Sequence, residues 1–532
     1  MNKPYQIAIV GGGPRALFAV ERLALEYEDA SPGRGLEVTV LDTTGQFGAG
    51  NIYAPGQPSY LIMNFATRHI DVWSEESHRR RSSTRLTLTE WLTRNHPTFS
   101  DPDAYVPRSL VGDYLMNAFS IVLDELPDGM SVSLIKARVS DLRKVGERWE
   151  LTTPTKTSRF DSVLLATGHD GWRHADPTDF SLRVYPVTQF LSERIITTES
   201  LVGIKGFGLT CIDACLALSE GRDGKFADLS DGDRQYVESG REPRSIYVYS
   251  RSGRPMLPKP DRRRAMIPNT WDSVWERYSR AISQLGPHYS FPDDLCRLLW
   301  NAADEAVAIT GNLQEKTTRE WFDEWMNGVW DAERIFKQLS VSLSSARGDA
   351  PPSHEIAIAE AWRNLYPALV RKLQHGGLPV TERENYEGFA SEMERIAFGP
   401  PAENVSKMLA LIDCGLVQLC DKPLPGAILI DARIPSPSAW SPTSPLGLLE
   451  EKGEVERIQE EKGIRVDSNA RPFGKAGRLK LNLGVVGRAT EGCVIGNDTL
   501  SRTLNKHVDR WASQEIQILS ASPKESMSLS AA

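Results

Sequence analysis

The sequence lacks the features that mark membrane-embedded and nucleic-acid-binding proteins. No apolar run approaches the roughly 18 residues that a membrane-spanning helix requires. The 532 residues include 62 basic and 70 acidic side chains, which give a net charge of −8, and no long run has one sign. A basic stripe is the usual mark of a protein that binds nucleic acid or a membrane surface, so neither partner is expected.

Cysteine is scarce and scattered. The six cysteines form no Cys-x-x-Cys pair and no cluster with histidine, which excludes a disulfide scaffold and a structural zinc site. The same absence argues against a disulfide reductase, because that class needs a redox-active cysteine pair. No basic segment or cleavage site precedes the first apolar strand, so no secretory leader is expected. We therefore expect a reduced, cytoplasmic protein of two or three domains, with no metal.

The first 50 residues predict a dinucleotide-binding unit. The apolar run at 6–10 is typical of a buried parallel strand, and the apolar spacing over 17–25 indicates a helix. Between them lies a Gly-x-Gly-x-x-Ala turn, which allows a pyrophosphate to approach the start of the helix. The next strand, at 36–41, ends in an acid suited to ribose hydroxyls. The expected cofactor contacts here are Gly11, Gly13, Pro14, Arg15, Ala16 and Asp42.

A second turn of the same kind lies in the middle of the chain. The strand at 200–205 leads into Gly206-x-Gly208 and then into a helix, and Thr210 is a further expected contact. Cys211 stands where a third glycine would be, and we interpret it as a small buried side chain rather than a redox group.

The strand after the second turn indicates which nucleotide binds there. It ends in Ser250-Arg251 without an acid. An acid would repel the 2′-phosphate of NADPH, whereas serine and arginine could hold it, so NADPH is favoured over NADH. Arg251 could also be an ordinary loop charge, and Arg222 and Arg254 are competitors for the same role.

Two dinucleotide motifs in one chain predict a flavin in one and a hydride donor in the other, that is, FAD and NADPH. Two further segments agree with this. The strand at 160–165 ends in Ala-Thr-Gly-His, where Thr167 and Gly168 are expected at the cofactor. Near the C-terminus a short strand leads to a loop ending in Asn497-Asp498, which suits contact with the flavin ribityl chain. Asp498 could instead serve only to cap the last helix.

The sequence resembles the bacterial FAD/NAD(P)-binding proteins related to flavin-dependent N-hydroxylating and Baeyer–Villiger monooxygenases. The resemblance rests on both glycine turns and on the segments 48–65, 239–255 and 487–498. It implies oxidation of the aspartate amine to nitrosuccinate with oxygen and NADPH, or alternatively hydroxylation of urate. It also implies that Met63 and Asn64 lie near the isoalloxazine ring. The sequence departs from the family pattern at the cysteine in the second turn.

In the leading interpretation NADPH reduces FAD, oxygen adds at flavin C4a, and the peroxyflavin transfers oxygen to a small polar substrate. No nucleophile arrangement is visible. Histidines could exchange protons near the flavin, and arginines could hold substrate carboxylates, although each could instead be structural. The alternatives are an NADPH-dependent flavin reductase or oxidoreductase without oxygen transfer and a non-catalytic NADPH sensor. The candidates for these roles are His69, His169, Arg68, Arg433 and Arg488.

The predicted fold class is α/β, with two Rossmann-like dinucleotide-binding domains and a helical insertion. Seven of the thirteen tryptophans lie between Trp271 and Trp362 at helical spacing, so the insertion should have an aromatic core, and it could cover the active site as a lid. The expected partners are a small-molecule substrate and oxygen, with a homo-oligomer possible. The expected boundaries are 1–175 for the first part of the FAD-binding domain, 176–262 for the NADPH-binding domain, 263–422 for the helical insertion, 423–518 for the second part of the FAD-binding domain and 519–532 for a disordered tail.

Overall fold

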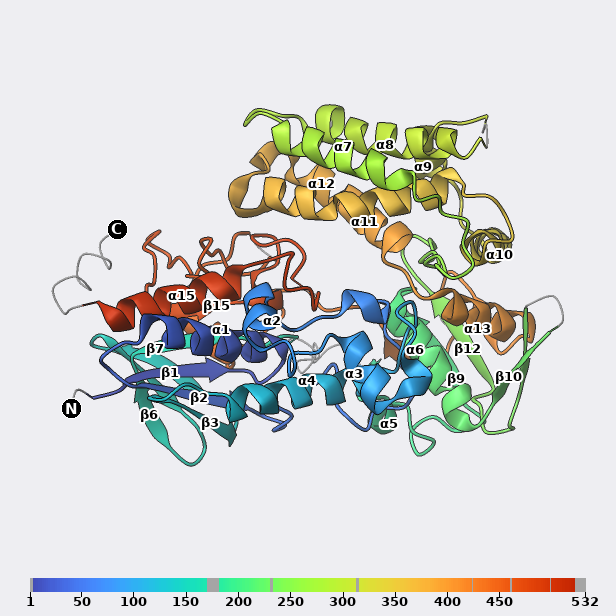
Figure 1. Cartoon of the computed structure of the whole chain (residues 1–532). Coiled ribbons are helices and arrows are strands. Elements are labelled where there is room, and N and C mark those ends of the chain that lie inside the picture. The colour runs from blue at the N-terminus through green and yellow to red at the C-terminus, as the bar shows by residue number, and fades with distance from the viewer. Residues whose placement is uncertain are drawn as a thin grey trace. The chain divides into compact units, whose positions relative to one another are not determined.

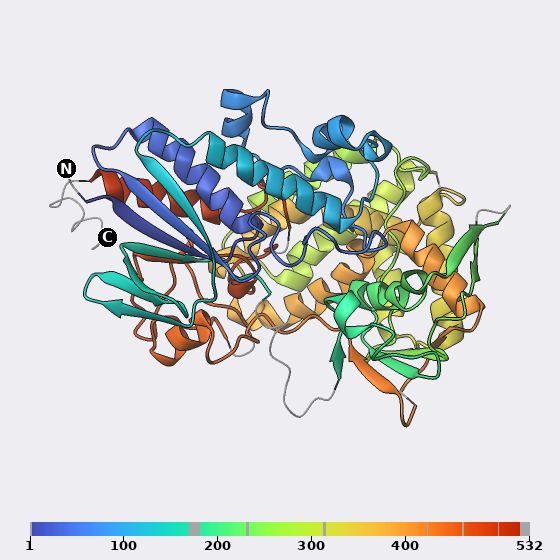
Figure 2. The same ribbon diagram turned by 90° about the horizontal axis from the view of Figure 1, so that it is seen from below.

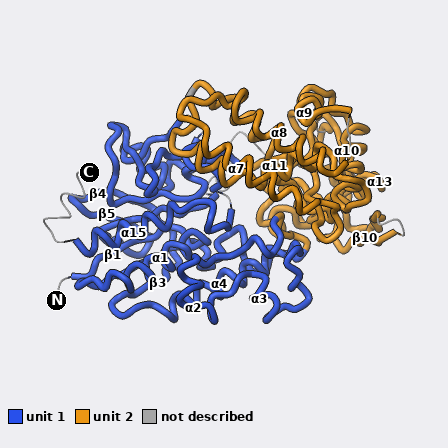
Figure 3. Tube along the Cα trace, turned by 45° about the horizontal axis from the view of Figure 1, so that its top comes forward, with its two compact units in different colours: residues 1–59, 65–175, 435–532 blue, residues 60–64, 176–434 orange. Residues whose placement is uncertain are grey.

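The computed structural model in Figure 1 contains two compact units, which Figure 3 colours separately. Unit 1 comprises Met1–Ser59, Phe65–Ala175 and Pro435–Ala532, and unit 2 comprises Tyr60–Asn64 and Asp176–Ile434. The structure describes residues 3–169, 181–229, 233–311, 315–422, 424–459, 462–497 and 499–521.

Unit 1 is built on a parallel five-stranded sheet with the order β15-β7-β1-β2-β3. The strands are β1 (Tyr5–Val10), β2 (Leu36–Asp42), β3 (Met130–Lys136), β7 (Ser162–Leu165) and β15 (Leu483–Val485). The long helix α1 packs against α4 and α15, and Figure 2 shows the dark blue α1 and the teal α4 side by side along the strands. The helices are α1 (Pro14–Ala30), α2 (Glu75–Arg81), α3 (Leu88–Asn95), α4 (Arg108–Asp124), α14 (Pro445–Glu451) and α15 (His507–Ser520).

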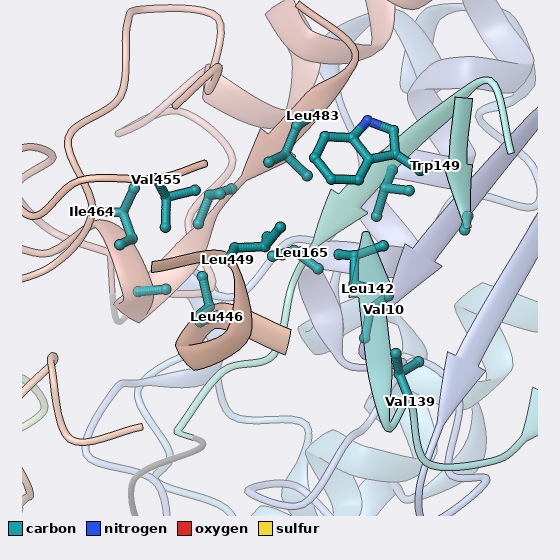
Figure 4. Packing of buried hydrophobic residues seen from close by; sticks show 14 of the residues in the cluster. Val10, Val139, Leu142, Trp149, Leu165, Leu446, Leu449, Val455, Ile464 and Leu483 are labelled. Atoms are coloured by element: carbon teal, nitrogen blue, oxygen red, sulfur yellow. The ribbon is translucent and has the colours of Figure 1, made fainter. Parts of the chain in front are cut away.

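A smaller antiparallel sheet completes the core of unit 1. Its strands are β4 (Asp141–Val145), β5 (Arg148–Thr152) and β6 (Thr157–Phe160). Trp149 is fully buried and belongs to one apolar cluster with Val10 and Leu165 of the large sheet and Leu446 and Leu449 of α14 (Figure 4). This apolar cluster fixes the strands that carry the first glycine turn.

Unit 2 repeats the same plan. Its parallel sheet has the order β13-β12-β9-β14-β8, so a central strand again has two neighbours on each side. The strands are β8 (Leu182–Arg183), β9 (Leu201–Lys205), β12 (Ser245–Tyr249), β13 (Val417–Leu419) and β14 (Ile428–Asp431), with a separate hairpin of β10 (Lys225–Asp228) and β11 (Arg234–Val237). The helices that accompany it are α5 (Val187–Phe190), α6 (Leu209–Ala217) and α13 (Ala402–Asp413).

The predicted helical insertion is present and has an aromatic core. Figure 1 shows α7 and α8 lying over α11 and α12. Trp271 and Trp362 are almost fully buried, and Phe389 makes ring contacts with Trp300, Phe322 and Trp362. The helices are α7 (Trp271–Gln284), α8 (Cys296–Ile309), α9 (Thr318–Asn327), α10 (Ala332–Arg347), α11 (His354–Leu373) and α12 (Arg383–Ala397).

The expected boundary at 423 is displaced. The strand β14, expected in the second part of the FAD-binding domain, pairs with β9 and belongs to unit 2. Likewise, β13 and α13, expected within 263–422, belong with the second sheet. A short apolar run predicts a buried strand but not the sheet that it joins, which explains the error. The expected tail from 519 begins inside α15, and residues 522–532 lie outside the described part.

No helix in the described part of the chain is both long and apolar enough to cross a membrane.

Candidate functional site

The first glycine turn joins β1 to α1 in unit 1. Gly11 has a φ of 107°, a backbone conformation that side chains rarely tolerate. A Cβ atom there would lie 2.2 Å from the carbonyl oxygen of Ala166, whose own amide donates to Val10 at 2.8 Å. The turn is therefore pressed against the end of β7, and only glycine fits.

The start of α1 is open to a ligand. Gly13 is the N-cap residue, no described side chain caps the helix, and Pro14 follows at the first turn. The free N–H groups and the helix dipole at such an end favour a phosphate. A Cβ atom on Gly13 would come no closer than 3.8 Å to Gly50, so the approach to the helix is not blocked by the protein.

Asp42 ends β2 and faces the same turn. One carboxylate oxygen accepts from the amide of Gly12 at 3.0 Å, and the other accepts from the amide and hydroxyl of Thr44 at 2.7 and 2.6 Å. A carboxylate has about four acceptor positions, so Asp42 can hold the turn and still accept from a ribose hydroxyl. Ribose binding by Asp42 stays a prediction.

The segment from Gly48 to Gly50 forms a contact that the glycine motif alone did not reveal. The amide of Gly48 donates to the carbonyl of Gly12 at 2.7 Å. A Cβ atom on Gly50 would lie 3.1 Å from the Cα atom of Gly13. The Gly-x-Gly spacing at 48–50 was the available signal, because two backbones that approach so closely need glycine on both sides.

Thr167 supplies the test of whether this unit fits a dinucleotide. Its hydroxyl is buried and has no hydrogen-bond partner among the described residues, and its amide nitrogen is 3.2 Å from the Cβ position of Gly11. A buried hydroxyl without a partner is costly unless a ligand satisfies it. The orphaned hydroxyl, the open helix start and the glycine approach together fit a bound dinucleotide.

Arg15 contacts a loop near the C-terminal end of unit 1. Its Nη2 donates to the carbonyl oxygens of Asn497 and Thr499, at 2.9 and 3.1 Å. Asn497 in turn donates to Thr490 and to the carbonyl of Val494. Arg15 therefore links the start of α1 to the C-terminal loop, and its predicted cofactor contact stays a prediction. Asp498 lies outside the described residues.

The second turn, in unit 2, has the same construction. Gly206 has a φ of 116°, and its amide donates to the carbonyl of Tyr249 at 2.9 Å. Gly208 caps α6 with no described side chain in support, and Thr210 lies in the first helical turn. The Cys211 thiol is fully buried, and its hydrogen bond with Cys215 and burial raise its pKa well above the usual range. The expected inert role of this cysteine agrees with its position, because a thiol so placed is a poor nucleophile.

The structure separates the three arginines that competed for the 2′-phosphate. Arg222 is buried and donates to the carbonyls of Leu191 and Ile196 at 3.0 and 2.9 Å. Arg254 forms a bidentate pair with Glu392 at 2.8 and 2.9 Å. Arg251, next to Ser250 at the end of β12, is exposed. This exposure favours Arg251, and its contact with the nucleotide stays a prediction.

A comparison of residues 8–170 with known families matches the model described as FAD-NAD(P)-binding. A nitrosuccinic acid synthase of Aspergillus oryzae is 26% identical, covering 81% of this chain and 79% of that protein. An L-aspartate N-monooxygenase (nitrosuccinate-forming) of Streptomyces cremeus is 24% identical, covering 78% of this chain and 74% of that protein. Residues 8–170 thus match an FAD-NAD(P)-binding domain, and the protein is a flavin-dependent monooxygenase. Among solved structures, L-lysine 6-monooxygenase from Pseudomonas syringae aligns with a TM-score of 0.42 and 11% identity over 96% of this chain and 98% of that chain.

These findings confirm the predicted fold class, the enzyme class and the cofactors FAD and NADPH of this monooxygenase. When bound, FAD would be held by the first turn, Asp42 and Thr167 of unit 1, and the pyridine nucleotide by the second turn and Arg251 of unit 2. The assignment of each nucleotide to its unit stays a prediction, as does the preference for NADPH over NADH.

The predicted proton-exchanging histidines of the monooxygenase differ in surroundings. His169, which follows Gly168, lines a small cavity of about 10 Å³ together with Arg488. Burial and the charge of Arg488 lower the pKa of His169 to about 4. Its imidazole is therefore neutral at pH 7, and its role in proton exchange stays a prediction. His69 is exposed at the end of a short helical turn.

Two of the three candidate arginines already hold partners within unit 1. Arg68 pairs with Asp103. Arg488 donates to Glu491 and to the carbonyl of Pro435, each at 2.8 Å. Each guanidinium has five N–H donors and could hold a substrate carboxylate beside these partners, so substrate binding by either arginine stays a prediction.

Arg433 corrects the sequence interpretation. It was expected to hold substrate in the flavin-binding domain, but it follows β14 and belongs to unit 2. Its Nε and Nη2 atoms each donate to Asp431 at 2.8 Å. This error has the same cause as the displaced boundary. Arg433 directly follows β14, so its position depends on the sheet that β14 joins.

Met63 and Asn64 also belong to unit 2, although the chain on both sides of Tyr60–Asn64 belongs to unit 1. Lys259 donates through Nζ to the carbonyl of Asn64, and the Asn64 amide donates to the carbonyl of Phe398 at 3.5 Å. Their expected position beside the isoalloxazine ring stays a prediction.

Proposed function

We propose that the protein N-oxygenates the primary amine of L-aspartate and carries the oxidation on to nitrosuccinate. The observation that carries this proposal is the similarity to nitrosuccinate-forming enzymes, which covers 78% to 81% of the chain. The absence of a redox cysteine pair agrees with oxygen as the electron acceptor, since the six cysteines form no Cys-x-x-Cys motif.

The first oxidation has a simple balance. The amine, oxygen, NADPH and one proton give the N-hydroxyamine, NADP⁺ and water. Bound FAD supplies the activation of oxygen with electrons taken from NADPH. The residues of the chain hold and orient the reactants: the open start of α1 and the Thr167 hydroxyl would bind FAD, and the open start of α6 would bind the nucleotide.

The nitrogen of the substrate must be unprotonated to accept oxygen. His169 is a poor base for this purpose, because burial and Arg488 lower its pKa to about 4. Nearby cations would favour the neutral amine over the ammonium form through like-charge repulsion. Arg488 offers such a charge, being mostly buried beside the cavity at the end of β7.

The test is product analysis with isotopic oxygen. FAD-loaded protein is incubated with L-aspartate, NADPH and ¹⁸O₂, and the products are resolved by mass spectrometry. Labelled N-hydroxyaspartate and nitrosuccinate are expected. Unchanged aspartate with NADPH consumed only to hydrogen peroxide would reject the substrate, and label in a urate product would establish C-hydroxylation instead.

A further inference from the structure

The two glycine turns share one pattern of backbone hydrogen bonds. The amide of the first glycine donates to a carbonyl at the end of one neighbouring strand, at 2.8 Å for Gly11 and 2.9 Å for Gly206. On the other side, the amides of Ala166 and Ala432 donate to the end of the central strand at 2.8 and 2.9 Å. Position for position, Ala432 of unit 2 thus corresponds to Ala166 of unit 1.

The two units differ at the residue that follows this alanine. Unit 1 has Thr167, whose buried hydroxyl has no hydrogen-bond partner among the described residues, and unit 2 has Arg433. The Cγ atom of Arg433 lies 3.3 Å from the Cβ position of Gly206, so the side chain leaves the backbone directly over the turn. Its guanidinium is half exposed, at 51%. It therefore lies at the carboxyl ends of parallel strands, where ligands of such sheets bind.

We propose that Arg433 binds the diphosphate of the pyridine nucleotide, separately from the arginine that reads the 2′-phosphate. The strands β14 and β12 flank β9 on opposite sides, which places Arg433 across the turn from Arg251. A guanidinium presents planar pairs of N–H donors that match phosphate oxygens. The inference rests on the proposed binding of NADPH by unit 2.

Asp431 orients the guanidinium. Its two oxygens receive Nε and Nη2 of Arg433, each at 2.8 Å, and its Oδ1 also accepts from the Arg433 amide at 3.0 Å. Asparagine at this position would keep one acceptor oxygen for the guanidinium, so Asp431→Asn removes the negative charge and leaves an orienting contact. The carboxylate is also a negative charge near the expected diphosphate, so its removal should not weaken nucleotide binding if Arg433 acts directly.

The experiment is calorimetric titration of the FAD-loaded protein with NADP⁺ and NAD⁺, which share the diphosphate and differ at the 2′-phosphate. Arg433→Gln should weaken both nucleotides about ten-fold and leave the ratio of their dissociation constants unchanged within about two-fold. Arg251→Ala should weaken NADP⁺ by a similar factor with little change for NAD⁺. Arg433→Lys, which keeps the charge, should recover part of the affinity.

Asp431→Asn is the matched control, because it breaks the same ion pair without removing the guanidinium. We expect it to bind both nucleotides at least as well as the parent protein. Equal losses in Arg433→Gln and Asp431→Asn would show a structural ion pair and overturn the proposal. Unchanged binding in Arg433→Gln, or a loss confined to NADP⁺, would also overturn it. Because these measurements detect binding alone, they are independent of whether aspartate is the substrate.

Discussion

The two glycine turns have the same backbone pattern but differ in how tightly they are closed and in the groups at their ends. A Cβ atom at Gly11 would lie 2.2 Å from a carbonyl oxygen, whereas one at Gly206 would lie 3.2 Å from the nearest backbone atom. The strand beside the first turn, β2, ends in an acid, Asp42. The strand beside the second turn, β12, is followed by Ser250-Arg251. We therefore expect the backbone to accept a dinucleotide in general, and the side chains after the flanking strands to select which one.

The largest loss of stability should come from adding a side chain at the first turn, where the structure leaves no space for one. We expect Gly11→Ala to destabilise unit 1 by about 4 kcal/mol or more, because the new Cβ atom collides with the Ala166 carbonyl at a positive φ. Gly206→Ala should cost about 1–3 kcal/mol, since its neighbours need to move only slightly. Thermal and urea unfolding of both variants measure the difference, and equal losses would show that the turns are equally tight.

Gly13→Leu should abolish flavin retention while the protein stays folded. The side chain would extend into the expected pyrophosphate path, and a Cβ atom there makes only an ordinary contact of 3.8 Å with Gly50. The absorbance of the purified protein at the flavin band, relative to protein, measures occupancy. Gly208→Leu in unit 2 is the matched control and should keep FAD but lose NADPH. Full FAD occupancy in Gly13→Leu would reject the assignment of FAD to unit 1.

Each unit also contains one buried glutamate whose burial raises its pKa from 4.5 to about 7: Glu515 in unit 1 and Glu355 in unit 2. Glu515 accepts from Tyr5 and Ser162, each at 2.9 Å, and Glu355 accepts from Gln338 at 2.8 Å. The folded state holds these protons more tightly than the unfolded state. The contribution of these two carboxyl groups to the free energy of unfolding should therefore be fully present below about pH 4.5. It should be lost as the pH rises through 7.

Replacing either glutamate by glutamine should remove part of this pH dependence. Glu515→Gln and Glu355→Gln should each unfold with a smaller loss of Tm between pH 5 and pH 8, and each should gain about 1–3 kcal/mol at pH 8. Thermal unfolding across that range is the measurement. A pH dependence identical to that of the parent protein would show that the carboxyl group concerned is ionised in the folded state at neutral pH.

The last prediction concerns nucleotide choice. Arg251→Ala should raise KM for NADPH about ten-fold and leave KM for NADH nearly unchanged, because it removes one charged contact worth about 1.5–3 kcal/mol. Steady-state oxidation of both nucleotides measures the change. If both cofactors suffer equally, Arg251 does not read the 2′-phosphate.

Short-range sequence patterns predicted most of the residues that form the two glycine turns. Strand, glycines, helix and the next strand end are consecutive, and their chemistry follows from short-range geometry, as at Gly11 and Asp42. Short-range patterns could not predict three other features of the structure. The sheet that β14 joins, the partners of Arg15 more than 480 residues away and the position of Met63 in unit 2 all depend on long-range packing. No spacing rule encodes such choices.

The pairing of β7 with β15 has a consequence for how the protein folds. The Ser162 hydroxyl donates to the carbonyl of Asn482, 320 residues further along, and the bulk of unit 2 lies between them. The entropic cost of closing so long a loop grows only logarithmically with length, and it falls further once unit 2 has become compact. During synthesis, β1, β2 and β7 emerge before unit 2, whereas β15 and α15 emerge after it. The sheet of unit 1 is therefore complete only after unit 2 has been made, and if FAD binds in unit 1 as predicted, its capture should follow that step.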